Sequence, residues 1–110
     1  MSESYQVTYS PQALSDLKEI YSYIAFSLQA VTTAKNQINR IRKEIRSLAV
    51  MPERYAALDW EPWGSMGMRK MAVNHFVVFY RVEKENFTVT VFRILYGGMD
   101  IDAVLQETIK

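Results

Sequence analysis

Hydrophobic and polar residues alternate at the start of the chain and then change to helical spacing. The alternation over residues 5–9 predicts a short strand. Ser10 as N-cap and Pro11 as the first helical residue predict that a helix begins there. Apolar residues three and four positions apart then continue this helix to about residues 27–30.

A second series with helical spacing covers residues 34–48. It follows Thr32 and Thr33, the candidates for its N-cap, and ends before Pro52. Because the connection between the two series is short, the sequence predicts a helical hairpin.

The second half of the chain has the densest strand signal. Segments 69–73, 76–83 and 87–96 are rich in β-branched and aromatic residues, and two short polar breaks separate them. Breaks this short join antiparallel neighbours, so the three strands are predicted to form a meander.

Two further segments lack a clear period or lie at the end of the chain. Residues 51–67 contain prolines, glycines and both Trp60 and Trp63, which predicts a long loop that is either functional or a lid over the core. After the meander, Asp100 or Asp102 can cap a last short helix.

The resulting order is β-α-α-β-β-β-α, typical of a small α+β domain that spans residues 1–110. The helical hairpin is expected to cover one face of an antiparallel or mixed four-stranded sheet. The other face is expected to stay partly open and to act as a binding surface.

Composition narrows the possible chemistry. The chain has no cysteine, which excludes disulfides and zinc–thiolate sites and fits a reducing cytoplasm. Its single histidine, His75, is expected in an exposed hairpin turn, and its carboxylates are scattered, so we expect neither a metal site nor a cofactor. No apolar run is long enough for a membrane span, and the first residues do not resemble a signal peptide, so a cytoplasmic protein is expected.

The formal net charge is only +1, which gives little reason to expect nucleic acid as a partner of the whole molecule. Within residues 37–46, however, four cations face a single carboxylate. A solvated helix face explains this cluster, and contact with an RNA or DNA backbone is the alternative.

Three arginines interrupt the predicted strands, where each guanidinium needs an acidic partner or water. They are Arg69, Arg81 and Arg93, and the period of two places Arg93 on the face of Val91 and Leu95. The arginines either gather on one sheet face or form ordinary surface pairs. The candidate acidic partners are Asp59, Glu61, Glu83 and Glu85.

Four motifs together resemble the RelE/ParE superfamily of toxins from bacterial type II toxin–antitoxin modules. They are SPxAxxDLxEI, LxxMPERY, RKMAVNHFVVFYRVE and VTVFRILYGGMDI, and they cover nearly the whole chain. The resemblance implies the fold predicted above, the inhibition of bacterial growth, and a cognate antitoxin that suppresses it.

The superfamily contains two activities. RelE- and YoeB-like members cut messenger RNA on the ribosome, whereas ParE-like members poison DNA gyrase. The resemblance to the nucleases implies catalytic roles for Glu61, Arg69 and Tyr96, with Lys70 near a catalytic lysine, although Leu95 replaces an expected histidine. The resemblance to ParE lies in the YRV and RILxG segments, in which Tyr96 stands where ParE members usually have a histidine.

RNA cleavage by the 2′-hydroxyl needs a base, a cation at the phosphate and an acid for the leaving oxygen. Glu61, Arg69 and Tyr96 can fill these roles in that order, with Lys70 or Arg81 as additional phosphate ligands. We therefore expect ribosome-dependent messenger RNA cleavage, with gyrase inhibition as the alternative. A degraded, non-toxic antitoxin-binding homologue is the third possibility.

The expected antitoxin is acidic and partly disordered, and it should bind the open sheet face. Arg81 and Arg93 would supply the cations of this interface. Apolar contacts would come from Trp63, Met66, Met68 and Met71.

Overall fold

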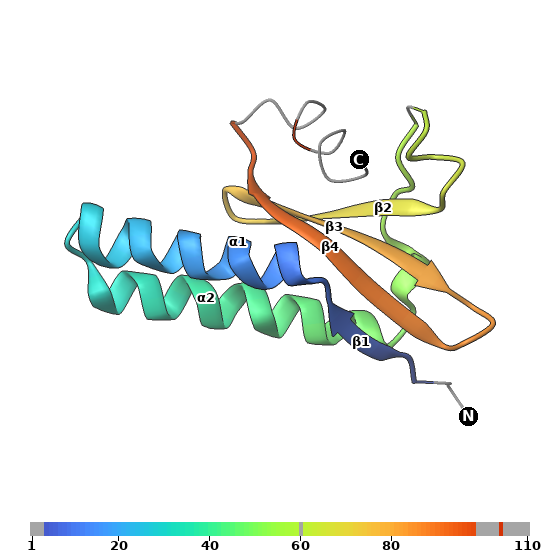
Figure 1. The fold of residues 1–110 in the computed structure, drawn as a ribbon. Coiled ribbons are helices and arrows are strands. Elements are labelled where there is room, and N and C mark those ends of the chain that lie inside the picture. The colour runs from blue at the N-terminus through green and yellow to red at the C-terminus, as the bar shows by residue number, and fades with distance from the viewer. Residues whose placement is uncertain (1–3, 60, 99–103, 105–110) are drawn as a thin grey trace.

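The computed structural model describes residues 4–59, 61–98 and 104. Figure 1 shows a long helical hairpin that lies along one side of a twisted sheet and extends beyond its end. The helices and strands are β1 (Gln6–Tyr9), α1 (Pro11–Ser22), α2 (Val31–Arg46), β2 (Met68–Val73), β3 (Phe76–Glu83) and β4 (Thr88–Tyr96).

The sheet has the order β1-β4-β3-β2. β2, β3 and β4 form the predicted antiparallel meander, while β1 pairs with β4 in parallel. The sheet is therefore mixed, and the predicted α+β class with a helical hairpin over four strands is confirmed.

The first helix begins as its sequence predicts. The Oγ of Ser10 accepts a hydrogen bond from the amide of Ala13 at 3.0 Å, and Pro11 is the first helical residue. The helix continues as a π-helical turn, Tyr23–Ser27. α2 begins at Val31, with no side-chain cap from Ala30. The prediction that Thr32 or Thr33 caps this helix is therefore wrong, because both residues lie inside its first turn.

The main core lies between the hairpin and one face of the sheet. The helices contribute small and branched residues, among them Ala13, Leu17 and Ile41, and the strands contribute large ones such as Tyr80. Tyr80 is fully buried, and its hydroxyl donates a hydrogen bond to the carbonyl of Pro52 at 2.7 Å.

The opposite face of the sheet carries a second core, and the prediction of an open face needs correction. Trp63, 1% exposed, packs there with Leu58, Met68, Phe79 and Leu95. The alternating apolar residues of β3 and β4 point to both faces, and the 51–67 loop folds back to cover this side. Trp63 is therefore a core lid, while Trp60 lies outside the described residues.

A β-bulge in β4 changes the predicted side-chain directions. Phe79 pairs with Arg93 and Tyr80 pairs with Val91, so Phe92 is an extra residue in the strand. Val91 consequently belongs to the main core and Leu95 to the second core. The prediction that Arg93 shares a face with both residues is wrong, since the bulge breaks the period of two.

The last predicted helix, with its cap candidates Asp100 and Asp102, lies outside the described residues apart from Val104, which is helical and packs against the second core. Among the residues that the structure describes, none of the helices has the length and apolar character needed to cross a membrane.

Candidate functional site

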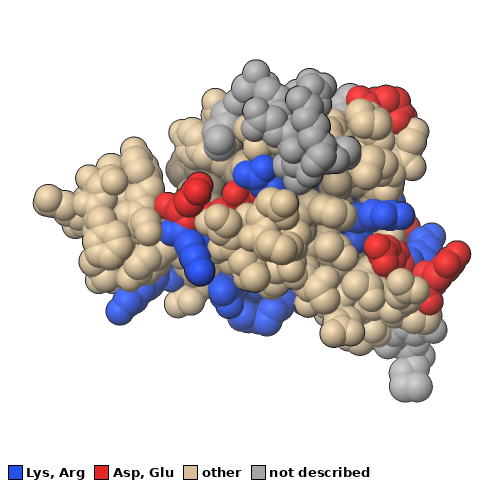
Figure 2. Space-filling model, in the orientation of Figure 1, with Lys and Arg blue, Asp and Glu red and all other residues tan. Residues whose placement is uncertain are grey.

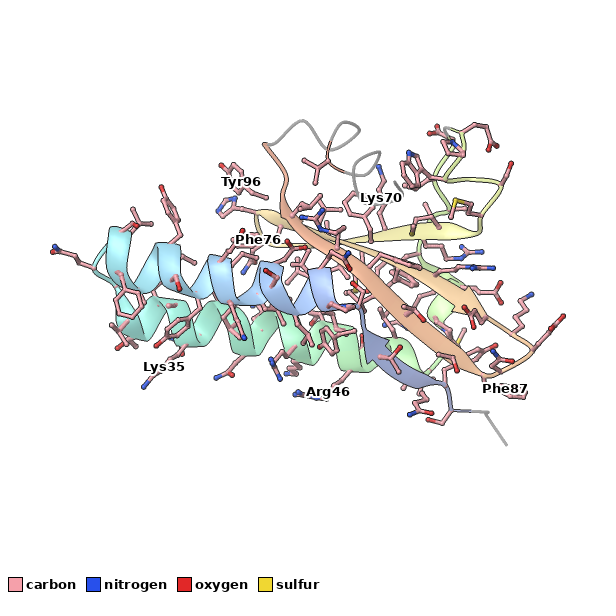
Figure 3. The ribbon with its side chains drawn as sticks, in the orientation of Figure 1. Lys35, Arg46, Lys70, Phe76, Phe87 and Tyr96 are labelled. Atoms are coloured by element: carbon pink, nitrogen blue, oxygen red, sulfur yellow. The ribbon has the colours of Figure 1, made fainter. Side chains whose placement is uncertain are left out.

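A groove of about 680 Å³ runs between the helical hairpin and the end of the sheet where β3 begins and β4 ends. In Figure 3, Phe76 and Tyr96 mark this end of the sheet, above the hairpin. The apolar residues that line the groove are Ile20, Tyr23, Ile24, Leu28, Phe76, Ile94, Leu95 and Tyr96.

Several of these apolar side chains are unusually accessible. Tyr23, Leu28 and Tyr96 are 59%, 55% and 53% exposed. Phe26, 68% exposed, lies in the same π-helical turn as Tyr23 and adds to an apolar hairpin tip, which is seen as the uncharged left end of the molecule in Figure 2. Exposed apolar surface concentrated in one place is typical of an interaction site.

Hydrogen bonds join the β2–β3 turn to α2 and to the end of β4. Asn74 in the β2–β3 turn donates from its side-chain amide to the Oε1 of Gln37 in α2 at 2.8 Å. In the same turn, the carbonyl of His75 accepts a hydrogen bond from the amide of Gly97 at 2.8 Å. His75 is exposed, as the sequence predicts, and lines the groove together with Gln37.

A charged pair borders the groove where α1 contacts β4. Asp16 is only 6% exposed and accepts hydrogen bonds from Nε and Nη2 of Arg93 at 2.8 and 2.9 Å. The amide of Ile94 donates a third bond to the same carboxylate at 2.9 Å. Arg93 thus helps to dock α1 onto β4, and its acidic partner is none of the four carboxylates named from the sequence.

Arg69 lies far from the groove and anchors the 51–67 loop. Its Nη1 donates to the carbonyls of Glu53 and Tyr55 at 3.2 and 2.6 Å, and Nη2 lies 3.6 Å from the Glu53 carboxylate. It pairs across the sheet with Tyr80, whose pKa is raised to about 12, chiefly by burial and against the opposing effect of the Arg69 charge. These contacts hold the loop against β2.

Tyr96 lies at the opposite end of the sheet from Arg69. Tyr96 pairs with Phe76, which in turn pairs with Val73, so Tyr96 is two strands across and four residues along from Arg69. With standard strand spacings this separates their Cα atoms by about 16 Å. The structure therefore does not bring these two candidate catalytic residues together.

Glu61 occupies a third location. It is exposed in the turn that carries Trp63 onto the second core, and its Oε2 accepts a hydrogen bond from the amide of Ser65 at 3.3 Å. Arg69, by contrast, lies opposite Tyr80, whose side chain belongs to the main core. Glu61 and Arg69 therefore lie on opposite sides of the sheet.

The remaining candidate cations do not form one cluster either. Lys70 is exposed and pairs with Phe79 of the second core. Arg81 is half-exposed, with Nη1 3.9 Å from the carboxylate of Glu83, the surface pair that the sequence allowed. In Figure 3, Lys70 lies on the upper side of the sheet, well away from Tyr96.

Sequence reasoning overlooked Asp16 and the groove residues of the hairpin. Asp16 follows Ala13 by three residues and precedes Leu17, so it lies on the buried face of α1, where a carboxylate needs a cation. The apolar tip had a signal as well, because Tyr23 and Phe26 fall outside the single apolar stripe that a sheet can cover.

The titratable groups of the groove do not form a metal site. Within residues 4–59, 61–98 and 104, no group of three or more His, Cys, Asp and Glu side chains is placed to hold a metal ion.

Comparison with known proteins supports the resemblance seen in the motifs. The structure is similar to that of the chromosomal ParDE toxin–antitoxin system from P. aeruginosa, with a TM-score of 0.69 and 20% identity over 84% of this chain and 96% of that one. A mutant of the E. coli toxin RelE in the free state gives a TM-score of 0.66 at 16% identity, covering 96% and 95%. The toxin–antitoxin complex RelBE2 from Mycobacterium tuberculosis gives 0.60 at 19% identity, covering 86% and 92%.

At these identities the structural matches show the fold alone, and no curated protein is significantly similar in sequence. The family is shown by a sequence model described as the ParE toxin of the type II toxin–antitoxin system parDE, which matches residues 7–101. The chain therefore belongs to the ParE toxin family of type II toxin–antitoxin systems.

Proposed function

We propose that this toxin arrests growth by binding DNA gyrase, in the manner of ParE-like proteins, and that it does not cleave messenger RNA. One observation carries the proposal: Glu61, Arg69 and Tyr96 lie at three separate places of the fold. A general base, a phosphate ligand and an acid must reach one scissile bond, which requires hydrogen-bond distances of about 3 Å.

The contacts of Arg69 give further support. A phosphate ligand should present its guanidinium to solvent, whereas this guanidinium donates to Glu53 and Tyr55 and lies beside a carboxylate. A gyrase inhibitor needs only a binding surface, and the exposed apolar side chains of the groove and hairpin tip supply one.

The partner proposed for the groove is the cognate antitoxin. The groove is lined largely by apolar side chains with a few polar ones, which suits an amphipathic segment of a partly disordered protein that folds on binding. Lys70 and Arg81, both accessible on the other side of the sheet, are placed to receive acidic residues of the same antitoxin. Trp63, Met68 and Met71 are buried in the two cores. In this proposal they therefore do not contact the antitoxin, contrary to the expectation from sequence.

Induced expression in a bacterium that lacks the antitoxin tests the target. We expect growth arrest, gyrase-dependent DNA breaks and an SOS response, with messenger RNA left intact. Tyr96→Phe should leave toxicity unchanged, because the phenol hydroxyl has no chemical role in this proposal.

Codon-phased RNA ends, detected by primer extension and absent from Tyr96→Phe, would overturn the proposal in favour of a ribosome-dependent nuclease. Normal colony formation despite folded protein would instead indicate a degraded toxin. Circular dichroism of each purified variant separates loss of folding from loss of activity.

A further inference from the structure

The outer surface of α2 concentrates positive charge. The helix contains Lys35, Arg40, Arg42, Lys43 and Arg46 against the single carboxylate of Glu44, a net of +4. The whole chain is only +1, so the other residues together carry a net charge of −3. Figure 2 shows the corresponding blue side chains along the lower edge of the hairpin, while blue and red are intermixed at the sheet end.

Within the described residues, these five cations differ from the three arginines of the sheet in having no ion pair with a carboxylate. All five are exposed, and within the part of the chain that the structure describes none of them lies within ion-pair distance of a carboxylate. Arg69, Arg81 and Arg93, by contrast, each face a carboxylate. The α2 charges are therefore available to a partner.

Helical geometry spreads the cations over one side of the helix, and three of them form one row. Lys35, Arg42 and Arg46 follow one another at seven and four residues, which places them on one flank over about 16 Å of helix. Figure 3 shows the first and last of them on the same edge of the hairpin. Arg42 lies 6.0 Å from the ring centroid of Tyr9, which holds this row on the β1 side. Lys43 and Arg40 lie about 80° and 140° around the axis from Lys35.

The surface among these cations is polar. Asn36 and Asn39 lie there and are exposed, whereas Ile38, Ile41 and Ile45 are buried or half-buried beneath. A protein partner usually needs aromatic or aliphatic anchors, and single-stranded nucleic acid needs aromatic side chains for stacking. The described residues from Lys35 to Arg46 expose neither, so a duplex sugar–phosphate backbone fits the surface best.

We propose that the outer face of α2 binds the phosphate backbone of double-stranded DNA, independently of sequence. An α-helix with its side chains is about 10–12 Å wide and fits the major groove of B-DNA, which is about 12 Å wide. The row of Lys35, Arg42 and Arg46 then faces phosphates on one side of the groove. Lys43 and Arg40 face those on the other side, with the asparagines among them. The deep, narrow major groove of duplex RNA does not admit a helix.

This surface lies on the hairpin, apart from the groove, and the proposal does not depend on the target of the toxin. Fluorescence anisotropy of the purified full chain with a labelled 20-base-pair DNA of arbitrary sequence tests it. We expect micromolar binding at low salt, and a loss of affinity that is linear in the logarithm of salt concentration. Lys35→Gln/Lys43→Gln should lower the affinity at least tenfold and reduce the slope by about 1.8, because two phosphate contacts are removed.

Lys18→Gln/Lys84→Gln is the matched control, since it removes two exposed lysines, from α1 and the β3–β4 turn, with the same change in net charge. This control should retain at least half of the affinity. An equal loss in both variants, tighter binding of single-stranded DNA or duplex RNA, or tighter binding of polyglutamate would each overturn the proposal. Neither lysine pair contributes to the groove, so toxicity and antitoxin binding remain separate readouts.

Discussion

Asp16 of α1 and Arg93 of β4 form a nearly buried, doubly hydrogen-bonded pair at the point where β1 stops covering the edge of β4. β1 pairs with β4 only as far as Val91. Three residues further along β4, the Asp16 carboxylate accepts a hydrogen bond from the amide of Ile94 while it also binds Arg93. The side chain thus replaces a strand partner, which satisfies a buried donor at the sheet edge.

Asp16→Asn should lower the free energy of unfolding by about 3 kcal/mol, because it leaves the Arg93 charge partly buried without its counter-ion. Urea denaturation followed by circular dichroism measures the change. Arg81→Ala is the control, and its exposed pair with Glu83 should contribute about 0.5 kcal/mol or less. A loss below 1 kcal/mol for Asp16→Asn would mean that the pair does not stabilise the docking of α1.

The folded protein should lose stability at high pH because of Tyr80, whose pKa is raised. Burial raises its pKa to about 12, whereas the unfolded phenol titrates near 10. The folded protein thus holds the proton more tightly, and the contribution of Tyr80 is complete below pH 10 and lost as the pH rises from about 10 to 12. Unfolding curves measured over this pH range should show that the free energy of unfolding decreases less in Tyr80→Phe than in the parent chain.

At neutral pH, Tyr80→Phe should lower the free energy of unfolding by about 1 kcal/mol, because the Pro52 carbonyl loses its donor. Tyr96→Phe serves as the control at a 53% exposed tyrosine and should keep the free energy of unfolding of the parent chain at neutral pH. The pKa of Tyr9 is also raised by burial, so part of the decrease should remain in both variants.

Local patterns in the sequence were sufficient to predict the elements of the fold. Ser10 and Pro11 determine where α1 begins, and the two short breaks determine the meander. The errors came from features with no local signal. The bulge at Phe92 depends on the register between β3 and β4, and α2 begins at Val31 with no side-chain cap to mark its start.

The candidate site was less predictable than the fold, because it depends on distances between segments. Arg69 and Tyr96 have the residue types that RNA cleavage needs, yet sequential strand order places them at opposite ends of the sheet. The partners of Arg69 and Arg93, Glu53 and Asp16, come from segments 16 and 77 residues away in the sequence. Side-chain pairing over such separations requires a tertiary structure.

The second core should depend on the indole ring of Trp63 for its stability. Trp63→Ala should lower the free energy of unfolding by about 4 kcal/mol, since the indole is 1% exposed and its loss leaves a large cavity. Its Nε1 has no acceptor among the described residues. Trp63→Phe removes this unpaired donor together with some apolar area, so a change within about 1 kcal/mol is expected. Equal losses in the two variants would contradict the role of the ring in filling the core.

The groove itself is tested by placing a charge on its hairpin wall. Tyr23 is 59% exposed, so Tyr23→Glu should fold normally, but it would place a carboxylate against the apolar segment of a bound antitoxin. We expect the affinity for the product of the neighbouring antitoxin reading frame to fall about 100-fold, or about 2.7 kcal/mol. Leu14→Glu is the matched control, because Leu14 is a 44% exposed residue of α1 that does not line the groove.

Calorimetric titration of both variants measures the difference in affinity. Co-expression provides a second readout, because the antitoxin should rescue growth in cells that produce Leu14→Glu but not in those that produce Tyr23→Glu. Unchanged affinity for Tyr23→Glu would place the antitoxin elsewhere on the molecule.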